Sequence, residues 1–288
     1  MVTRLLRIRR IRSEDIPFAV RLTDREKWGV TRADLERLML LNPRGCFLAY
    51  DGTRKLGLTT TTTYGKKLAW IGNVIVHKNY RGKHIGRALV EHATMQLQET
   101  GVEHIALYCY KEQASFYDNL GFARDRRFVR LRRNAAKVEH LREESEFKRP
   151  PPIAKLLAAD MQAFGADRSK LIRAVLTDDA GWILGISHGI SSTSYLMVKE
   201  SVEECELGPW ICLHPSRDEP SRMIYQALIR VGSVPVEVGC FRGNRPAMRI
   251  LKNNGFRTVR EGYRMFFQER AKIGDEKAQY GLGFLDKG

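Results

Sequence analysis

The stretch WIGNVIVHKNYRGKHIGRALV, residues 70–90, joins an apolar run to a segment with helical periodicity. The run at 70–76 is typical of a buried strand, and residues 85–99 repeat apolar side chains as one face of a helix does. At the junction, residues 81–87 carry two glycines and three cations, namely Arg81, Gly82, Lys83, Gly86 and Arg87. The N–H groups at a helix start form an anion site, to which the helix dipole contributes. The stretch therefore predicts a strand, loop and helix that together bind phosphate.

The loop matches neither of two common phosphate-binding patterns. No G-K-[ST] follows, as in a Walker loop, and G-x-G-x-x-G, the dinucleotide fingerprint, is absent. A loop with glycine and arginine can also serve only to turn the chain. Taken alone, the loop leaves a cofactor site and a plain turn open.

The surrounding pattern predicts a mixed α/β fold. Apolar and polar residues alternate in the expected strands, and Asp51-Gly52 marks a hairpin turn. Capping residues such as Thr31 mark the helix starts. In the first half we expect strands at 5–11, 46–50, 56–64, 68–76, 105–109 and 122–133, and helices at 13–23, 32–41, 85–99 and 113–120.

A polar segment that ends in three prolines, residues 134–152, indicates a domain boundary. The predicted helices and strands after it repeat the order of the first half. FYDNLGF at 116–122 and ILKNNGF at 250–256 each close a short helix with Gly-Phe. We expect a catalytic domain at 1–133, a linker at 134–152 and a diverged, degenerate copy at 153–288.

Val74-Ile75-Val76, followed by HKNYRGKHIG at 77–86, resembles the GNAT superfamily of acetyl-CoA-dependent N-acetyltransferases. The family signature, [QR]-x-x-G-x-[GA], follows a strand with a V-x-V-like end. The strand IALYCY before FYDNLGF matches the family's second landmark. The resemblance covers residues 1–133 strongly. A GNAT-like first half followed by a diverged second half resembles a two-domain branch of bacterial and archaeal acetyltransferases. The stretch YGLGFLDKG at 280–288 is part of this resemblance.

The resemblance implies the GNAT fold, with a mixed central sheet whose fourth and fifth strands splay apart to admit the pantetheine arm of acetyl-CoA. The residues that it implies for the cofactor are Val74, Ile75, Val76, Arg81, Gly82, Lys83, His84, Ile85, Gly86 and Arg87. A plain buried strand is equally compatible with the first three. His84 replaces the first glycine of the signature. We expect binding of acetyl-CoA to survive this change, and its affinity is the property left open.

The implied reaction is direct attack by a primary amine on the acetyl thioester. A backbone N–H between Asn73 and Val76 would stabilise the carbonyl oxygen at a bulge of the fourth strand. Tyr117 matches the tyrosine that helps to protonate the leaving thiolate, with core packing as the alternative. Tyr110 stands where the family often has an asparagine, which puts one cofactor contact in question.

No motif identifies the general base. Glu26, His77 and Glu112 are candidates, although each can equally be a surface residue. Trp28 and the first two helices are expected to border the acceptor. A primary amine is implied, and a small molecule is favoured over a protein.

The second half lacks the phosphate loop. Its counterpart, HPSRDEP at 214–220, has no glycine, two carboxylates that repel a diphosphate, and two prolines without N–H donors. Leu251 takes the place of Tyr117. We therefore expect one cofactor site per chain, in the first half. The second half is expected to be catalytically silent, and either to stabilise the first half or to form a wall of the acceptor pocket.

The formal net charge of +16 attracts polyanions and leaves a nucleic-acid-binding alternative open. Residues 124–133 carry the densest basic run, but alternation in a strand with solvated arginines also explains it. A further alternative is an acyl-CoA-binding sensor without turnover.

Cysteine usage and hydropathy bear on location. The five cysteines are odd in number, widely spaced and free of C-x-x-C, which indicates reduced thiols in a cytoplasmic protein and neither a disulfide framework nor a metal site. No apolar run of about 18 residues occurs, so we expect no membrane association. The pattern of the first twelve residues predicts a strand and not a signal peptide. The oligomeric state stays open.

Overall fold

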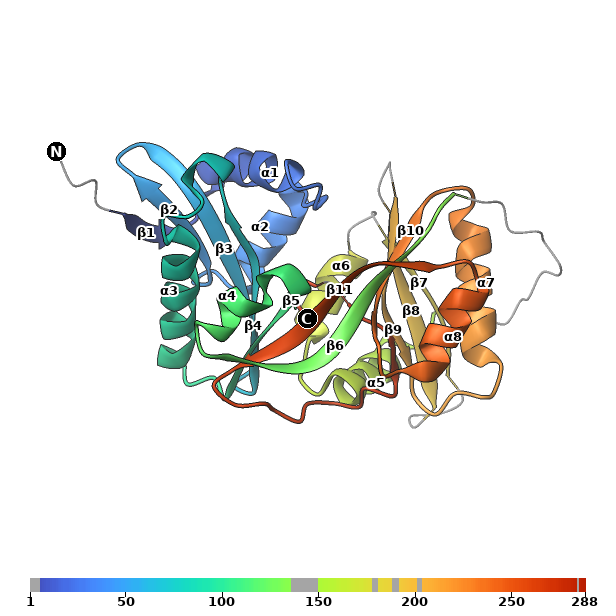
Figure 1. Cartoon of the computed structure of the whole chain (residues 1–288). Coiled ribbons are helices and arrows are strands. Elements are labelled where there is room, and N and C mark those ends of the chain that lie inside the picture. Colours follow the sequence, from blue (N-terminus) through green and yellow to red (C-terminus); the bar gives the residue numbers. More distant parts are fainter. Residues whose placement is uncertain (1–5, 136–149, 178–180, 188–191, 201–203, 284) are drawn as a thin grey trace.

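The computed structural model describes residues 6–135, 150–177, 181–187, 192–200, 204–283 and 285–288 (Figure 1). The strands are β1 Arg7–Arg10, β2 Cys46–Asp51, β3 Arg54–Tyr64, β4 Leu68–Val76, β5 His104–Tyr110, β6 Phe122–Arg133, β7 Gly181–Ser187, β8 Thr193–Glu200, β9 Cys205–Cys212, β10 Val236–Phe241, β11 Arg257–Phe267 and β12 Gln279–Gly281. The α-helices are α1 Ile16–Asp24, α2 Arg32–Leu41, α3 Ile85–Glu99, α4 Ala114–Asp118, α5 Ile153–Phe164, α6 Ser169–Leu176, α7 Glu219–Val231 and α8 Arg245–Asn253.

The mixed α/β class and the order of elements in the first half agree with the prediction. Two strands near the end of the sequence, β11 and β12, were not predicted. Most of the expected linker, residues 136–149, lies outside the described residues. Among the described residues, no helix has the length and apolar character to cross a membrane.

Short-range hydrogen bonds explain where several helices begin and end. The Thr31 hydroxyl accepts from the Asp34 N–H at 3.1 Å, and the Asp34 carboxylate accepts from the Thr31 N–H at 3.0 Å, which closes a capping box at the start of α2. Gly165, with φ of +90°, ends α5 in the left-handed region that favours glycine. These signals are local, so the sequence pattern found most helices.

The strands form one sheet in the order β1-β2-β3-β4-β5-β11-β6-β10-β9-β8-β7, with β12 paired to β9 off this path. In the first half, α3 packs on one face of the sheet, where its Leu89 shares a buried cluster with Ile71. Helices α1 and α2 cover the opposite face, and Leu38 there shares a cluster with Leu48. In the second half, α7 and α8 lie together on one face (Figure 1).

The two halves exchange strands at the centre of the sheet. Strand β11 of the second half pairs antiparallel with β5, from Gly262 opposite Tyr110 to Phe266 opposite Ala106. Strand β6 of the first half pairs antiparallel with β10, from Val236 opposite Arg133 onward. Strands β6 and β11 also pair with each other, and they cross the middle of the molecule in Figure 1. Each half therefore completes its sheet with a strand of the other.

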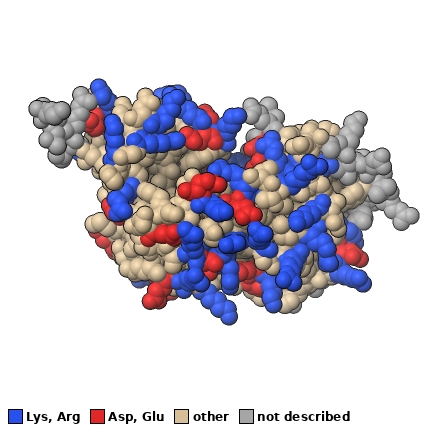
Figure 2. Space-filling view, in the orientation of Figure 1, with Lys and Arg blue, Asp and Glu red and all other residues tan. Residues whose placement is uncertain are grey.

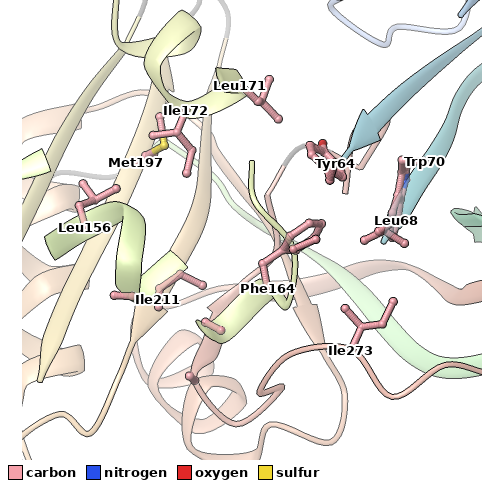
Figure 3. Packing of buried hydrophobic residues seen from close by; sticks show 14 of the residues in the cluster. Tyr64, Leu68, Trp70, Leu156, Phe164, Leu171, Ile172, Met197, Ile211 and Ile273 are labelled. Carbon is pink, nitrogen blue, oxygen red and sulfur yellow. The ribbon is translucent and has the colours of Figure 1, made fainter. Parts of the chain in front are cut away.

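A buried cluster joins the halves beside these strands. Phe164 of α5 lies edge-on to Tyr64 of β3, with ring centroids 5.3 Å apart, and 6.4 Å from the Trp70 ring of β4. Figure 3 shows Phe164 between these rings and side chains of the second half. Lys199 of β8 forms an ion pair at 2.8 Å with the buried Asp34 of α2. Apolar and ionic contacts thus fix one half against the other.

Both halves contain a pair of parallel strands that diverges. Strand β4 pairs with β5 only from Leu68 to Trp70, opposite His104 to Ala106, so the rest of β4 is not paired to β5. Strand β9 pairs with β10 only from Cys205 to Leu207. This divergence agrees with the splayed fourth and fifth strands that we expected. We call the two gaps the first and the second opening.

Candidate active site

The predicted phosphate loop lies at the start of α3, at the end of β4. His84 is the N-cap residue of α3 and has a left-handed backbone, φ +59° and ψ 11°. Gly82 before it has φ of +76°. The first N–H groups of a helix have no acceptor within the helix, so those of Ile85, Gly86 and Arg87 are directed out of its end. This geometry supplies the backbone donors that an anion site needs.

The cationic side chains of the loop are largely bonded to the protein itself. Arg81 pairs with Glu26 at 2.5 Å and donates to the Val76 carbonyl at 3.0 Å. Arg87 pairs with Glu91 at 3.0 Å and donates to the Asn119 carbonyl at the end of α4. Lys83 lies over the Tyr80 ring, with Nζ 5.5 Å from its centroid. Part of the side-chain charge is therefore already neutralised, so an anion at this loop would depend mainly on the backbone N–H groups.

Strand β4 carries a bulge beside the first opening. Its register against β3 shifts between Gly72, opposite Thr60, and Ile75, opposite Leu58. Asn73 in the bulge has φ of +50°, which is rare for a residue with a side chain. A bulge releases backbone groups from the ladder. A free N–H between Asn73 and Val76, as expected from the sequence, is therefore compatible with this strand.

The three apolar residues that follow the bulge divide between the two faces of the sheet. Val74 and Val76 are half-buried and pack with the cluster under α3. Ile75 is buried in the cluster under α1 and α2. A pantetheine arm on the α3 face would therefore meet Val74 and Val76 by side chain, and Ile75 by backbone alone.

Tyr117 lies on α4, next to the phosphate loop. It is buried, with the ring centroid of Phe116 at 4.9 Å and that of Phe122 at 5.9 Å. A Cβ added at Gly86 would be 3.6 Å from Phe116, so α3 and α4 are neighbours here. Burial raises the pKa of Tyr117, with a smaller contribution from Cys109. The phenol therefore stays protonated at neutral pH and is able to donate to a thiolate.

The candidate bases lie at the rim of this region. Glu26 is ion-paired to Arg81, as described above. His77 contacts Arg25 at 2.5 Å, and burial together with nearby cations lowers the pKa of its imidazole. Glu112 is exposed, and its nearest cationic partner is Arg260 at 3.8 Å. The lowered pKa keeps the imidazole of His77 neutral at neutral pH, but its Nε2 faces Arg25 and its Nδ1 accepts from the Asn79 N–H at 3.3 Å.

The structure also places Tyr110 and Trp28, two other residues that the sequence singled out. The guanidinium carbon of Arg260 lies 3.6 Å from the centroid of the Tyr110 ring, so Tyr110 stacks with a cation of the second half. Trp28 has 41% of its surface exposed. It is therefore a surface side chain and not part of the core.

Sequence reasoning missed a segment of the second half that reaches this site. Residues 285–288 lie against β4 on the face opposite α3, and Asn73 donates to the Asp286 carboxylate at 3.0 Å. The two residues are 213 positions apart in the sequence. No local pattern connects them, so only the folded chain identifies Asp286 as a neighbour of the bulge.

The second opening is filled by the chain itself. Strand β12 pairs with β9, and Leu282 after it bridges to Gly239 of β10. A Cβ on Gly208 of β9 would lie only 1.9 Å from the Leu282 carbonyl. At the start of α7, Pro220 lies in the first turn and Glu219 is buried. Leu251, the counterpart of Tyr117, is fully buried in the core.

The basic run on β6 is extensively ion-paired. Arg124 pairs with Asp118 at 2.5 Å, and Arg126 with Glu276 at 2.8 Å. Arg130 is bound by Glu206 at 2.7 Å and by Glu237 at 2.8 Å. In Figure 2, acidic side chains lie among the basic ones across the middle of this face. The run thus joins strands and does not present a uniform basic surface to nucleic acid.

Comparison with known proteins agrees with this geometry. Family profiles described as "Acetyltransferase (GNAT) domain" match residues 42–124 and, separately, 156–281. The uncharacterized N-acetyltransferase YitH of Bacillus subtilis is 26% identical over 242 residues, which cover 83% of this chain and 84% of YitH.

Two solved structures share the fold over nearly the whole chain. A putative acetyltransferase of Pyrococcus horikoshii superposes with a TM-score of 0.81 at 21% identity, covering 98% of this chain and 96% of its own. A tandem GNAT protein from the clavulanic acid biosynthesis pathway gives a TM-score of 0.64 at 12% identity, covering 93% of this chain and all of its own (100%).

The chain therefore belongs to the GNAT acetyltransferase family, as a two-domain member, and is an acyltransferase. The resemblance and the fold expected from the sequence are both confirmed. The individual site residues and the domain limits stay predictions.

Proposed function

We propose that this protein is an acetyl-CoA-dependent N-acetyltransferase, and that its first half transfers the acetyl group directly to a primary amine. The observation that supports this most is the position of the β4 bulge. It lies at the first opening, on the strand that leads into the start of α3. A thioester in the opening would meet a backbone N–H, while a diphosphate would meet the helix end.

The residues present fit acetyl-CoA as a substrate. Free N–H groups at Ile85, Gly86 and Arg87 suit a diphosphate, and nothing lies within 4 Å of a Cβ added at Gly82, so this part of the loop is open. Lys83 and Arg87 would add charge. Val74 and Val76 would line the path of the pantetheine arm.

Each chemical step has a candidate residue. The amine nitrogen bonds to the carbonyl carbon, and the carbon–sulfur bond breaks. The N–H of the bulge holds the charge that develops on the oxygen. The thiolate takes a proton with help from the hydroxyl of Tyr117, and the amine gives up its own to solvent or to a base such as Glu26, His77 or Glu112.

We propose that the second half does not bind acetyl-CoA. Support comes from β12, which fills the second opening, and from the prolines and carboxylates at the start of α7. The five cysteines are buried and free of disulfides, which suits a reducing compartment, and we keep the cytoplasm as the expected location. We expect no metal requirement.

A screen of primary amines with acetyl-CoA, following thiol release, tests the proposal. Transfer to at least one small amine supports it. Tight binding of acetyl-CoA without transfer to any amine would favour the sensor alternative. A salt-sensitive shift of random DNA, without binding of acetyl-CoA, would favour the nucleic-acid alternative.

A further inference from the structure

The segment formed by residues 285–288, which we call the wall segment, crosses the first opening on the face opposite α3. On one side, Leu285 packs into a cluster with Tyr108 and Tyr110 of β5. On the other, the Asp286 carboxylate accepts from Asn73 in the β4 bulge. The segment thus bridges the two strands at the point where they have separated. Because the expected pantetheine path is on the α3 face, the wall segment lies where an acceptor would approach.

Several contacts hold the wall segment in place. Trp70 donates from its indole N–H to the Leu285 carbonyl at 3.2 Å, and the Tyr64 hydroxyl donates to the Lys287 carbonyl. The buried Arg168 donates to the Gly288 carbonyl at 2.7 Å.

The fit of the segment against the sheet is close. A Cβ on Gly72 would lie 2.0 Å from the Asp286 carbonyl, and a Cβ on Gly288 would lie 2.8 Å from the Trp70 ring. The segment is therefore a fixed wall of the site and not a lid.

Asp286 is the accessible charge on this wall. Its side chain keeps 21% of its surface exposed, whereas that of Lys287, which pairs with it at 2.7 Å, keeps only 4%. Lys287 also acts on the buried Asp34. Burial alone would raise the pKa of Asp34, but the cations of Lys287 and Lys199 outweigh this and hold the pKa well below its usual range. Asp34 is also paired with Lys199 and with Arg37, while Lys287 binds both carboxylate oxygens of Asp286. A further cation would approach Asp286 on the part of its carboxylate that stays exposed.

Polar groups of β3 complete this surface. Asn73 donates its side-chain amide both to Thr60 Oγ1 and to Asp286, each at 3.0 Å, which fixes the carboxylate beside the bulge.

We propose that Asp286 is the residue that selects the acceptor, by binding its ammonium group before the amine gives up a proton. The proposal rests on the N-acetyltransferase function above and assigns to the second half a part in the acceptor pocket. The substrate class is a cationic primary amine, because the charge that the wall segment exposes beside the bulge is negative. An ionised carboxylate and an ammonium form a charge-assisted hydrogen bond that a neutral molecule does not form.

The kinetic test compares Asp286→Asn with the wild type, using the best amine from the screen. We expect KM for the amine to rise about tenfold, the equivalent of one charge-assisted hydrogen bond. We expect kcat to change much less, the Kd of acetyl-CoA to stay constant, and Asp286→Glu to restore part of the affinity. The matched control is Glu99→Gln, which removes one exposed carboxylate at the far end of α3 and should leave both constants unchanged.

A binding measurement keeps the inference testable without turnover. Calorimetry in the presence of CoA would compare butylammonium chloride with 1-butanol, its neutral counterpart of the same size. The wild type should favour the cation, and Asp286→Asn should lose that preference while its Tm and its Kd for CoA remain those of the wild type.

The outcomes separate this inference from the proposed function. Transfer by the wild type with an unchanged KM in Asp286→Asn would overturn the role of Asp286 and leave the function intact. A cation preference that depends on Asp286, in a protein that acetylates no amine, would support a cation site at Asp286 but reject both the function and the role of Asp286 in choosing an acceptor. A cation preference that survives in Asp286→Asn contradicts the inference in either case.

Discussion

His84 holds a left-handed backbone at the N-cap of α3, where glycine would be less strained. We expect His84→Gly to relieve about 1 kcal/mol of strain, part of which is offset by the greater freedom of glycine in the unfolded chain. The Tm should hold or rise slightly, and affinity for acetyl-CoA should hold or improve. Titration of acetyl-CoA into both proteins checks this. A loss of affinity in His84→Gly would mean that the imidazole itself binds phosphate.

Gly86 and Lys83 distinguish a backbone cradle from a basic patch. A Cβ on Gly86 would make ordinary contacts, 3.6 Å from Phe116 and 3.7 Å from Val76, but the larger side chain in Gly86→Val would extend over the helix end. We expect Gly86→Val to weaken acetyl-CoA binding more than tenfold. Lys83→Ala should cost less than about fivefold, because an exposed ionic contact contributes about 1 kcal/mol or less. Measurement of Kd at two salt concentrations tests this, and the reverse order would refute the backbone cradle.

Tyr117 is predicted to assist the leaving thiolate from a buried position. Tyr117→Phe should lower kcat by about 10²-fold or less, since a thiolate is already a tolerable leaving group. The Kd of acetyl-CoA should not change, because the hydroxyl carries no charge that would bind phosphate. Steady-state kinetics with the best amine, beside calorimetry with acetyl-CoA, checks both points. Turnover at the wild-type rate would show that Tyr117 only packs α4 against the sheet.

At the scale of elements, β12 distinguishes the two openings. The first opening is bordered by a bulged strand and a helix start with free N–H groups, while the second is closed by Gln279–Gly281 and Leu282. We therefore expect calorimetry to give one acetyl-CoA site per chain. Gly86→Val should remove that site without leaving a second, weaker one. Two equivalent sites in the wild type would contradict this prediction.

At the scale of the whole molecule, the exchange of β6 and β11 makes the halves interdependent. Residues 1–133 alone would lack β11 between β5 and β6, and residues 150–288 alone would lack β6 beside β10. We expect each piece by itself to aggregate or to unfold without cooperativity, because unpaired strand edges are exposed. Coexpression of the two pieces should restore a complex that binds acetyl-CoA, as gel filtration and calorimetry would detect. Cooperative unfolding of residues 1–133 alone would show that the exchange is dispensable.

The strand exchange also explains what the sequence pattern missed in the fold. Alternation in residues 122–133 correctly predicted β6, but nothing in that alternation shows that β11 and β10 are its neighbours. Pairing partners are set by the whole sheet, and the pattern of one strand reports only which of its faces is buried.

The sequence by itself determined the local units of this protein. The apolar run of β4, the basic loop and the periodicity of α3 are adjacent in the chain, so they predict a phosphate site and indicate the GNAT family without tertiary contacts. The tertiary structure alone decided how the second half takes part. It brought β12 into the second opening and placed Asp286 beside Asn73 across 213 positions. The physical reason is that side-chain period and helix signals act over a few residues, whereas the occupant of an opening depends on the packing of the complete chain.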